Sequence, residues 1–158
     1  MLDTTLKFSQ KFFDLYSAYQ DKAAAVQIIR EVLHRELRLN AELAKEAREL
    51  PSQEREGQLV PALLNSMQTS GFDALSSSGI PLTKVFPERW SLQETEKVTY
   101  AQHLKKIHCV SDLVERAYHR TRVQKIRYQV GQSKNQQAVN YLAVLLREAA
   151  KATGHSNF

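Results

Sequence analysis

The sequence predicts an all-α fold: a single-domain helical bundle of about five main helices plus one or two short helices. All four prolines lie between residues 51 and 87, and the first 50 residues contain neither proline nor glycine. Outside that middle segment, apolar residues recur every three or four positions, which is the period of a helix with one buried side. Long stretches without proline or glycine can propagate helix uninterrupted.

The N-terminal third is expected to form two helices. Asp3 can cap a first helix that ends near residue 20, and a second helix runs from about residue 22 to Leu50, where Pro51 stops it. A single rod over this length would extend about 70 Å, which is longer than a compact domain of this size, so we expect a bend near residues 20–21. The inner side of the second helix is expected to carry Val26, Ile29, Leu33, Leu37, Leu43, Ala47 and Leu50.

Residues 51–91 are interpreted as an irregular, proline-containing connection. Pro61 is suited to open a short helix and Gly71 to close it, and a second short helix is expected at residues 72–77. Residues 76–90 combine turn-forming and apolar residues, so we expect an ordered loop packed over the core.

The C-terminal half is expected to contain three main helices. Ser91 and Glu94 have the spacing of a capping box, and Ser111 and Ser133 are candidate caps for the two helices that follow. The predicted ranges are residues 91–108, 112–129 and 133–152, followed by a frayed tail at residues 153–158.

The composition favours a cytoplasmic protein. The 158 residues include one cysteine, which excludes an internal disulfide framework, and no stretch approaches the roughly 20 apolar residues of a membrane span. The net charge of +5 is concentrated between His103 and Lys134, where eight Lys or Arg and two acids give a charge of +6. The protein is therefore a nearly neutral body with one basic segment.

This basic segment is the predicted binding surface. At 100° per residue, Arg116, Arg120 and Arg127 fall within about 40° of one another on the helix at residues 112–129. We expect a non-enzymatic interaction module whose basic helix contacts an acidic protein or nucleic acid. Alternatively, the arginines form a solvated face of the helix or pair with buried acidic residues. The predicted binding residues are Arg116, Arg120, Arg127, Lys105, Lys106 and Lys125.

A homodimer is also predicted. The first 50 residues could form one extended helix, and Val123 and Ile126 lie opposite the main apolar face of their own helix. Tyr118 and Tyr128, which are interleaved with the arginines, could stack on bases or belong to the core.

Two polar residues interrupt the apolar seam of the helix at residues 22–50. Glu36 and Asn40 lie one turn apart in line with Leu33 and Leu43. Buried polar groups need partners, so Glu36 is expected either to pair with an arginine of the basic helix or to line a pocket or a site that a partner recognises.

No metal, cofactor or catalytic residue is predicted. Glu31 and His34 have the spacing found in di-iron carboxylate bundles, but those bundles need a second such pair. Helical ribonucleases of the HEPN type carry an arginine and a histidine on one helix with four to six residues between them, and no pair here has that separation. A HEPN-like ribonuclease or effector built from distant residues, such as His119 with Arg116 and Arg120, is the alternative function.

Three fragments resemble a loose set of uncharacterised bacterial all-helical proteins. They are the segment from Glu36 to Asn40, the connection from Phe72 to Leu82, and the segment from Leu113 to Tyr118. The resemblance spans about residues 28–150. It implies an all-helical fold and a bacterial origin, and it selects Glu36, Arg38 and Asn40 as a buried polar group or pocket.

Overall fold

The longest helix of the fold is α2 (Lys22–Glu49), and it confirms the prediction for this segment. The computed structural model describes residues 11–12, 14, 22–51, 57, 59–93, 100–130 and 136–154, and the fold over these ranges is all-α. Ile29, Leu33 and Leu37 are completely buried on the inner side of α2. The helix ends directly before Leu50 and Pro51, as expected from the restriction that proline places on the preceding residue.

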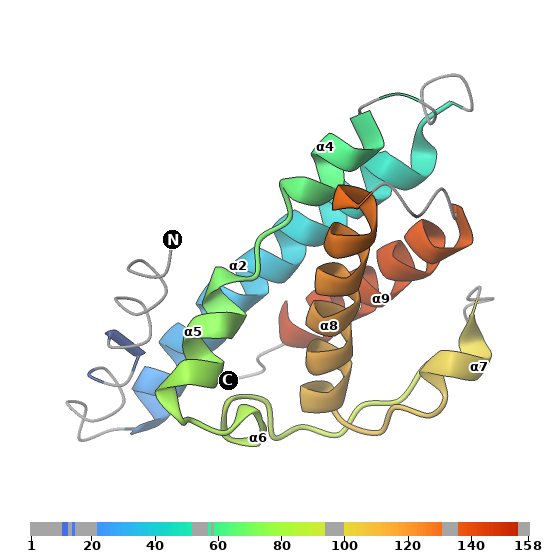
Figure 1. Cartoon of the computed structure of the whole chain (residues 1–158). Coiled ribbons are helices and arrows are strands. Elements are labelled where there is room, and N and C mark those ends of the chain that lie inside the picture. Colours follow the sequence, from blue (N-terminus) through green and yellow to red (C-terminus); the bar gives the residue numbers. More distant parts are fainter. Residues whose placement is uncertain are drawn as a thin grey trace.

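The core lies between α2 and two other long helices, α8 (Val110–Gln129) and α9 (Gln136–Gly154). α2 packs along α9, and α8 packs against α9 (Figure 1). The apolar stripe predicted for the last helix is buried. Its members are Val139, Leu142, Leu145 and Ala149.

The proline-containing connection forms three short helices. They are α4 (Leu59–Asn65), which packs against α2 and α8, and α5 (Ser70–Ser78) and α6 (Leu82–Val85), which both contact α2. Ile80 and Phe86 are buried, which confirms that the segment between them covers the core. The prediction for Gly71 was wrong: α4 ends at Asn65, and Gly71 lies in the first turn of α5.

The long helix predicted at residues 91–108 is the main error in the fold. Residues 91–93 and 105–108 are not helical, and only α7 (Ala101–Leu104) forms within the described part of this range. Trp90 N–H donates to the His108 carbonyl and Val110 N–H donates to the Glu88 carbonyl, both at 3.0 Å. These two bonds make an isolated antiparallel bridge. The bonds occupy backbone groups of residues 90 and 108, which lie at the two ends of the predicted helix at residues 91–108. The long-range pairing therefore competes with that helix.

The ends of the described chain refine two further predictions. α9 continues through Gly154, and Thr153 is buried with its hydroxyl donating to the Ala149 carbonyl at 2.9 Å, so the tail does not fray at residue 153. Most of the predicted first helix, the bend at residues 20–21 and the candidate cap Ser133 lie outside the described residues. No helix in the described ranges has the length and apolarity needed to cross a membrane.

Candidate functional site

Three exposed arginines follow the outer side of α8. Arg116, Arg120 and Arg127, here called the arginine strip, all lie on the solvent side of the helix. Arg116 Nε donates to Asp112 Oδ1 at 3.1 Å, and the Arg120 guanidinium lies 5.5 Å from the centre of the Tyr141 ring. Exposed pairs of this kind contribute little to stability, so the strip can contact a partner at small cost to the fold.

The three lysines predicted to extend this surface lie in different surroundings. Lys105 and Lys106 are exposed in the turn that follows α7. Figure 1 shows α7 well separated from the C-terminal half of α8, where Arg127 lies. Lys125 is half-buried, and its Nζ donates to the Met67 carbonyl at 2.7 Å. Lys125 therefore ties α8 to the α4–α5 loop.

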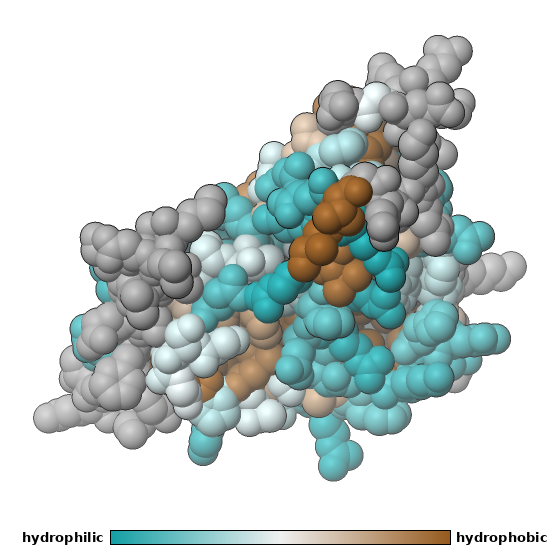
Figure 2. All heavy atoms as spheres, viewed as in Figure 1, coloured by the Kyte–Doolittle hydropathy of each residue, from teal (hydrophilic) through white to brown (hydrophobic). Residues whose placement is uncertain are grey.

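An apolar group lies beside the arginine strip. The apolar end of α8 consists of Val123, Ile126 and the residue that directly follows the helix, Val130; Ile126 is 54% exposed and Val130 is 63% exposed. Figure 2 shows hydrophobic surface over the C-terminal part of α8. The outer face of α8 is thus basic along much of its length and apolar at one end.

The two tyrosines of α8 belong more to the core than to this surface. Tyr118 is fully buried and stacks on Phe72, with ring centres 4.4 Å apart and planes 14° from parallel. Burial, together with the negative charge of nearby Glu36, raises the pKa of Tyr118 well above its usual value. Tyr128 is half-buried, and burial raises its pKa as well. Tyr118 cannot stack on a base.

Glu36 holds the start of α5 and does not pair with an arginine of the basic helix. Its Oε2 accepts hydrogen bonds from Gly71 N–H at 2.9 Å and from the Ser70 hydroxyl at 3.2 Å, and its Oε1 accepts one from Phe72 N–H at 3.3 Å. The residue that precedes α5, Thr69, makes no side-chain cap of its own. A carboxylate from a distant helix therefore satisfies amide groups that the first turn leaves unpaired.

Gly71 makes this contact possible. A Cβ atom at position 71 would lie 3.2 and 3.3 Å from the two carboxylate oxygens of Glu36, and 3.3 Å from Leu33 Cδ2. The sequence signal that could have revealed the contact is a glycine in the first turn of a helix that lacks its own cap, together with an acidic residue in an otherwise apolar seam.

Asn40 binds the backbone next to the same helix start. Its Nδ2 donates to the Gln68 carbonyl at 2.6 Å, and its Oδ1 accepts from Gln68 N–H at 2.8 Å. Asn40 is completely buried. Glu36 and Asn40, together called the backbone clamp, hold the α4–α5 loop against α2. Of the three residues predicted to group here, Arg38 is exposed and its charge acts on His34 instead.

His34 joins α2 to the end of α9. Its Nδ1 lies 3.0 Å from Thr153 Oγ1, and both residues line a hollow of about 210 Å³. Burial lowers the pKa of His34, as do the charges of Arg38 and Arg35, while the Ala150 carbonyl opposes this shift. The spacing of His34 from Glu31 is that of a metal-ligand pair, but the described residues contain no group of three His, Cys, Asp or Glu side chains able to hold a metal ion.

Arg30 has its own partners inside the fold. It is 6% exposed, its Nη1 donates to the Val85 carbonyl at 3.0 Å and pairs with Glu88, and its guanidinium lies over the Phe86 ring. Arg30 therefore fixes α6 and the following segment to α2.

Comparisons of the chain with protein-family models, curated proteins and solved structures return no match.

Proposed function

We propose that the protein is a non-enzymatic interaction module whose outer α8 face binds an acidic protein surface. The observation that carries this proposal is the exposure of Ile126 and Val130, 54% and 63%, on the same helix as the arginine strip. Removing apolar side chains from water favours association, and arginine is enriched at protein interfaces. A partner with acidic residues around an apolar centre would complement both parts of the face.

Nucleic acid fits this face less well. Interfaces with nucleic acid are polar and strongly positive, and single strands are commonly held by aromatic stacking. The apolar end of α8 is aliphatic, and Tyr118 is buried beneath the helix. An acidic protein is therefore the better occupant.

A second copy of the chain is the competing protein occupant. In a twofold dimer the same surface patch lies on both sides, so a dimer formed through α8 would bring two arginine strips close together. Like charges that face each other cost energy, and salt would weaken this repulsion. Added salt should therefore strengthen a homodimer formed through this face and weaken the binding of an acidic partner to it.

The ribonuclease alternative has less support. Its candidate residues, His119, Arg116 and Arg120, lie on an exposed helix face. Acid–base catalysis on a phosphodiester requires groups positioned around the reacting atoms, usually in a site with restricted access of water. The arginine strip is better suited to binding.

The proposal can be tested with defined probes. One probe is an amphipathic helical peptide with leucine on one side and glutamate on the other, a second has the same composition in scrambled order, and a third is a single-stranded RNA of similar charge. We expect the amphipathic peptide to bind at least about tenfold more tightly than the other two, a difference of about 1.4 kcal/mol. Isothermal titration calorimetry gives each affinity.

Variants separate the two parts of the face. Ile126→Ser with Val130→Ser should remove the preference for the amphipathic peptide, and Arg120→Glu with Arg127→Glu should abolish binding to both acidic peptides. Leu59→Ser and Lys84→Glu are matched controls, because both residues are exposed on other helices. Tighter binding of RNA than of the amphipathic peptide, or equal binding of the two peptides, would contradict the proposal.

A further inference from the structure

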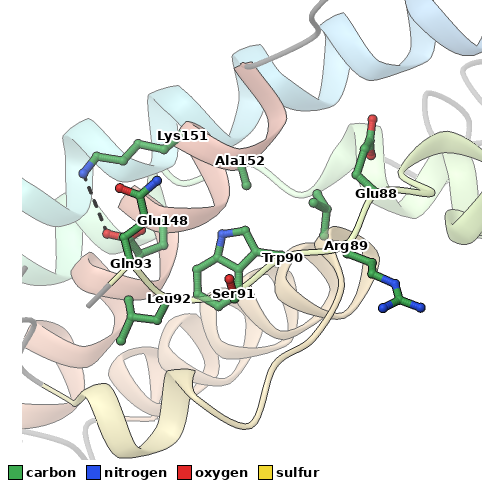
Figure 3. A pocket seen from close by; sticks show the side chains of 10 residues that line it. Glu88, Arg89, Trp90, Ser91, Leu92, Gln93, Glu148, Lys151 and Ala152 are labelled. Carbon is green, nitrogen blue, oxygen red and sulfur yellow. Dashed lines mark ion pairs between the residues drawn. The ribbon is translucent and has the colours of Figure 1, made fainter. Parts of the chain in front are cut away.

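A second candidate site lies away from the outer face of α8. A hollow of about 360 Å³ opens between residues 88–93, the start of α8 and the last turns of α9 (Figure 3). Figure 3 shows the Trp90 indole at the centre of the lining residues, with Glu148 and Gln93 on one side of it. The backbone N–H of Trp90 donates a hydrogen bond to the His108 carbonyl, so the backbone bridge fixes the position of Trp90.

Glu148 supplies a buried acceptor to this hollow. Its side chain is only 10% exposed, and among the described residues Oε1 pairs with Arg147 Nη2 at 3.2 Å and with Lys151 Nζ at 3.8 Å. Arg147 Nε also donates to Oε1, at 3.3 Å, and the Glu148 side chain lines the hollow. Carboxylates accept strong hydrogen bonds from N–H donors, so Glu148 offers a donor group a binding position in the hollow.

The charges around the hollow restrict the chemistry of a ligand. A simple anion would meet the carboxylates of Glu148 and Glu88, and a simple cation would meet Lys151 and Arg89. A ligand with a neutral, flat ring that carries N–H donors, and with an anionic group elsewhere, suits all of these residues. Nucleotides have this combination.

We propose that the hollow binds a purine nucleotide, with guanine preferred, whose base lies against Trp90 and donates to Glu148. Guanine carries two adjacent N–H donor groups on its Watson–Crick edge, whereas adenine and cytosine offer one amino group. The carbonyls that flank the single N–H of uracil would meet the carboxylate unfavourably. Proteins read unpaired bases in this way, by stacking and by hydrogen bonds to that edge.

The size of the site is suitable. Small-molecule sites typically have volumes of about 300–1,000 Å³. A neighbouring hollow of about 410 Å³ shares Arg89, Trp90 and Ser91 with the first, which adds room for a sugar and a phosphate. Lys151 and Arg89 place positive charge at the edges of this combined space, where the phosphate would lie.

Trp90 also provides the measurement. It is the only tryptophan in the chain, so fluorescence excited selectively at tryptophan reports on the surroundings of this residue. Titration of the protein with GMP should give saturable quenching at micromolar to low millimolar concentration. AMP and CMP should bind more weakly than GMP, UMP should bind most weakly, and ribose 5-phosphate should have no effect.

Two variants test the two contacts. Glu148→Gln should reduce GMP affinity at least about tenfold and reduce the difference between GMP and UMP. Trp90→Leu should reduce binding measured by calorimetry, because leucine keeps an apolar side chain and removes stacking. Glu42→Gln, an exposed substitution on α2, is the control, and circular dichroism establishes that each variant is folded.

Several outcomes would overturn the proposal, and the titrations of the unmodified protein are sufficient for most of them. One such outcome is that no nucleotide gives saturable quenching, and a second is that ribose 5-phosphate quenches as strongly as GMP. A third is that a cationic probe, arginine methyl ester, quenches more strongly than GMP. Unchanged GMP affinity in a folded Glu148→Gln protein would also contradict it. None of these results bears on peptide binding by α8, so the two proposals can fail separately.

Discussion

Glu36 and Gly71 lie 35 residues apart in the sequence and are joined by a 2.9 Å hydrogen bond from the Gly71 amide to Glu36 Oε2. The bond places a negative charge at the N-terminus of α5, where the helix dipole and the unpaired amide groups both favour it. It also explains why an acidic residue interrupts the apolar seam of α2.

Replacing Glu36 should destabilise the protein strongly. Glu36→Ala leaves the Gly71 and Phe72 amides without their acceptor, and hydrogen bonds to a charged group are each worth roughly 1.5–3 kcal/mol. We expect the free energy of unfolding, measured in urea, to fall by about 3 kcal/mol. Glu42→Ala is the matched control because Glu42 is exposed on the same helix, and it should change stability by less than about 0.5 kcal/mol.

Gly71→Ala should destabilise the protein although alanine favours helix over glycine by about 1 kcal/mol. The added Cβ would lie 3.2 Å from Glu36 Oε1, so the carboxylate has to move away from the amides that it binds. We expect a net loss of about 1–2 kcal/mol. In a Glu36→Ala background the cost should be smaller, and equal costs in both backgrounds would show that the contact does not matter.

Reversing the charge of the arginine strip should leave the fold intact. Arg120 and Arg127 are exposed, and Glu36 takes its hydrogen bonds from Ser70, Gly71 and Phe72. The Arg120→Glu, Arg127→Glu protein should therefore melt within a few degrees of the unmodified protein. A loss of about 3–5 kcal/mol, the typical cost of leaving a buried charge unpaired, would instead indicate that these arginines serve the core.

Stability should depend on the protonation of His34. Its pKa in the folded protein lies below the usual 6.5, mainly because of burial, so the unfolded chain takes up the proton first as the pH falls. Stability is then lost as the pH falls below about 6.5 and through the lowered pKa. Urea unfolding at pH 7.5 and pH 5 should show a larger loss for the unmodified protein than for His34→Gln, and equal losses would contradict the prediction.

Light scattering tests the predicted homodimer. If the apolar end of α8 forms the contact, the protein should have twice the monomer mass at high micromolar concentration, and Ile126→Glu should return it to the monomer. Because Ile126 is 54% exposed, this substitution should disturb association more than folding. A monomer mass for the unmodified protein would contradict the prediction, and a dimer unaffected by Ile126→Glu would place its interface elsewhere.

Local pattern was sufficient for the long helices. α2 follows from a run without proline or glycine and from apolar residues such as Leu33 and Leu37 at helical spacing. The same reasoning failed at residues 91–108, because the bonds of Trp90 with His108 and of Val110 with Glu88 join segments that are distant in sequence. Backbone pairing of this kind leaves no pattern of side chains that could be recognised in the sequence.

The polar groups were predicted less completely than the helices. Glu36 and Asn40 were recognised because they interrupt an apolar stripe. Their partners are backbone groups of residues 68–72 and the Ser70 hydroxyl, which have no charge or motif to identify them. The arginine strip was predicted from helical spacing alone, since the residues concerned lie on one regular helix. Glu148 was missed because its hollow forms between segments that the sequence does not show to be neighbours.

The pairing of α2 with α9 has a consequence for synthesis of the protein. The apolar side of α2 is complete once residue 49 has been made, but the helix that covers much of it begins only at residue 136. At about 5–20 residues per second, the ribosome needs roughly 4–17 s to make the intervening chain. During that interval the side of α2 that packs against α9 in the finished fold is a hydrophobic surface that molecular chaperones can bind.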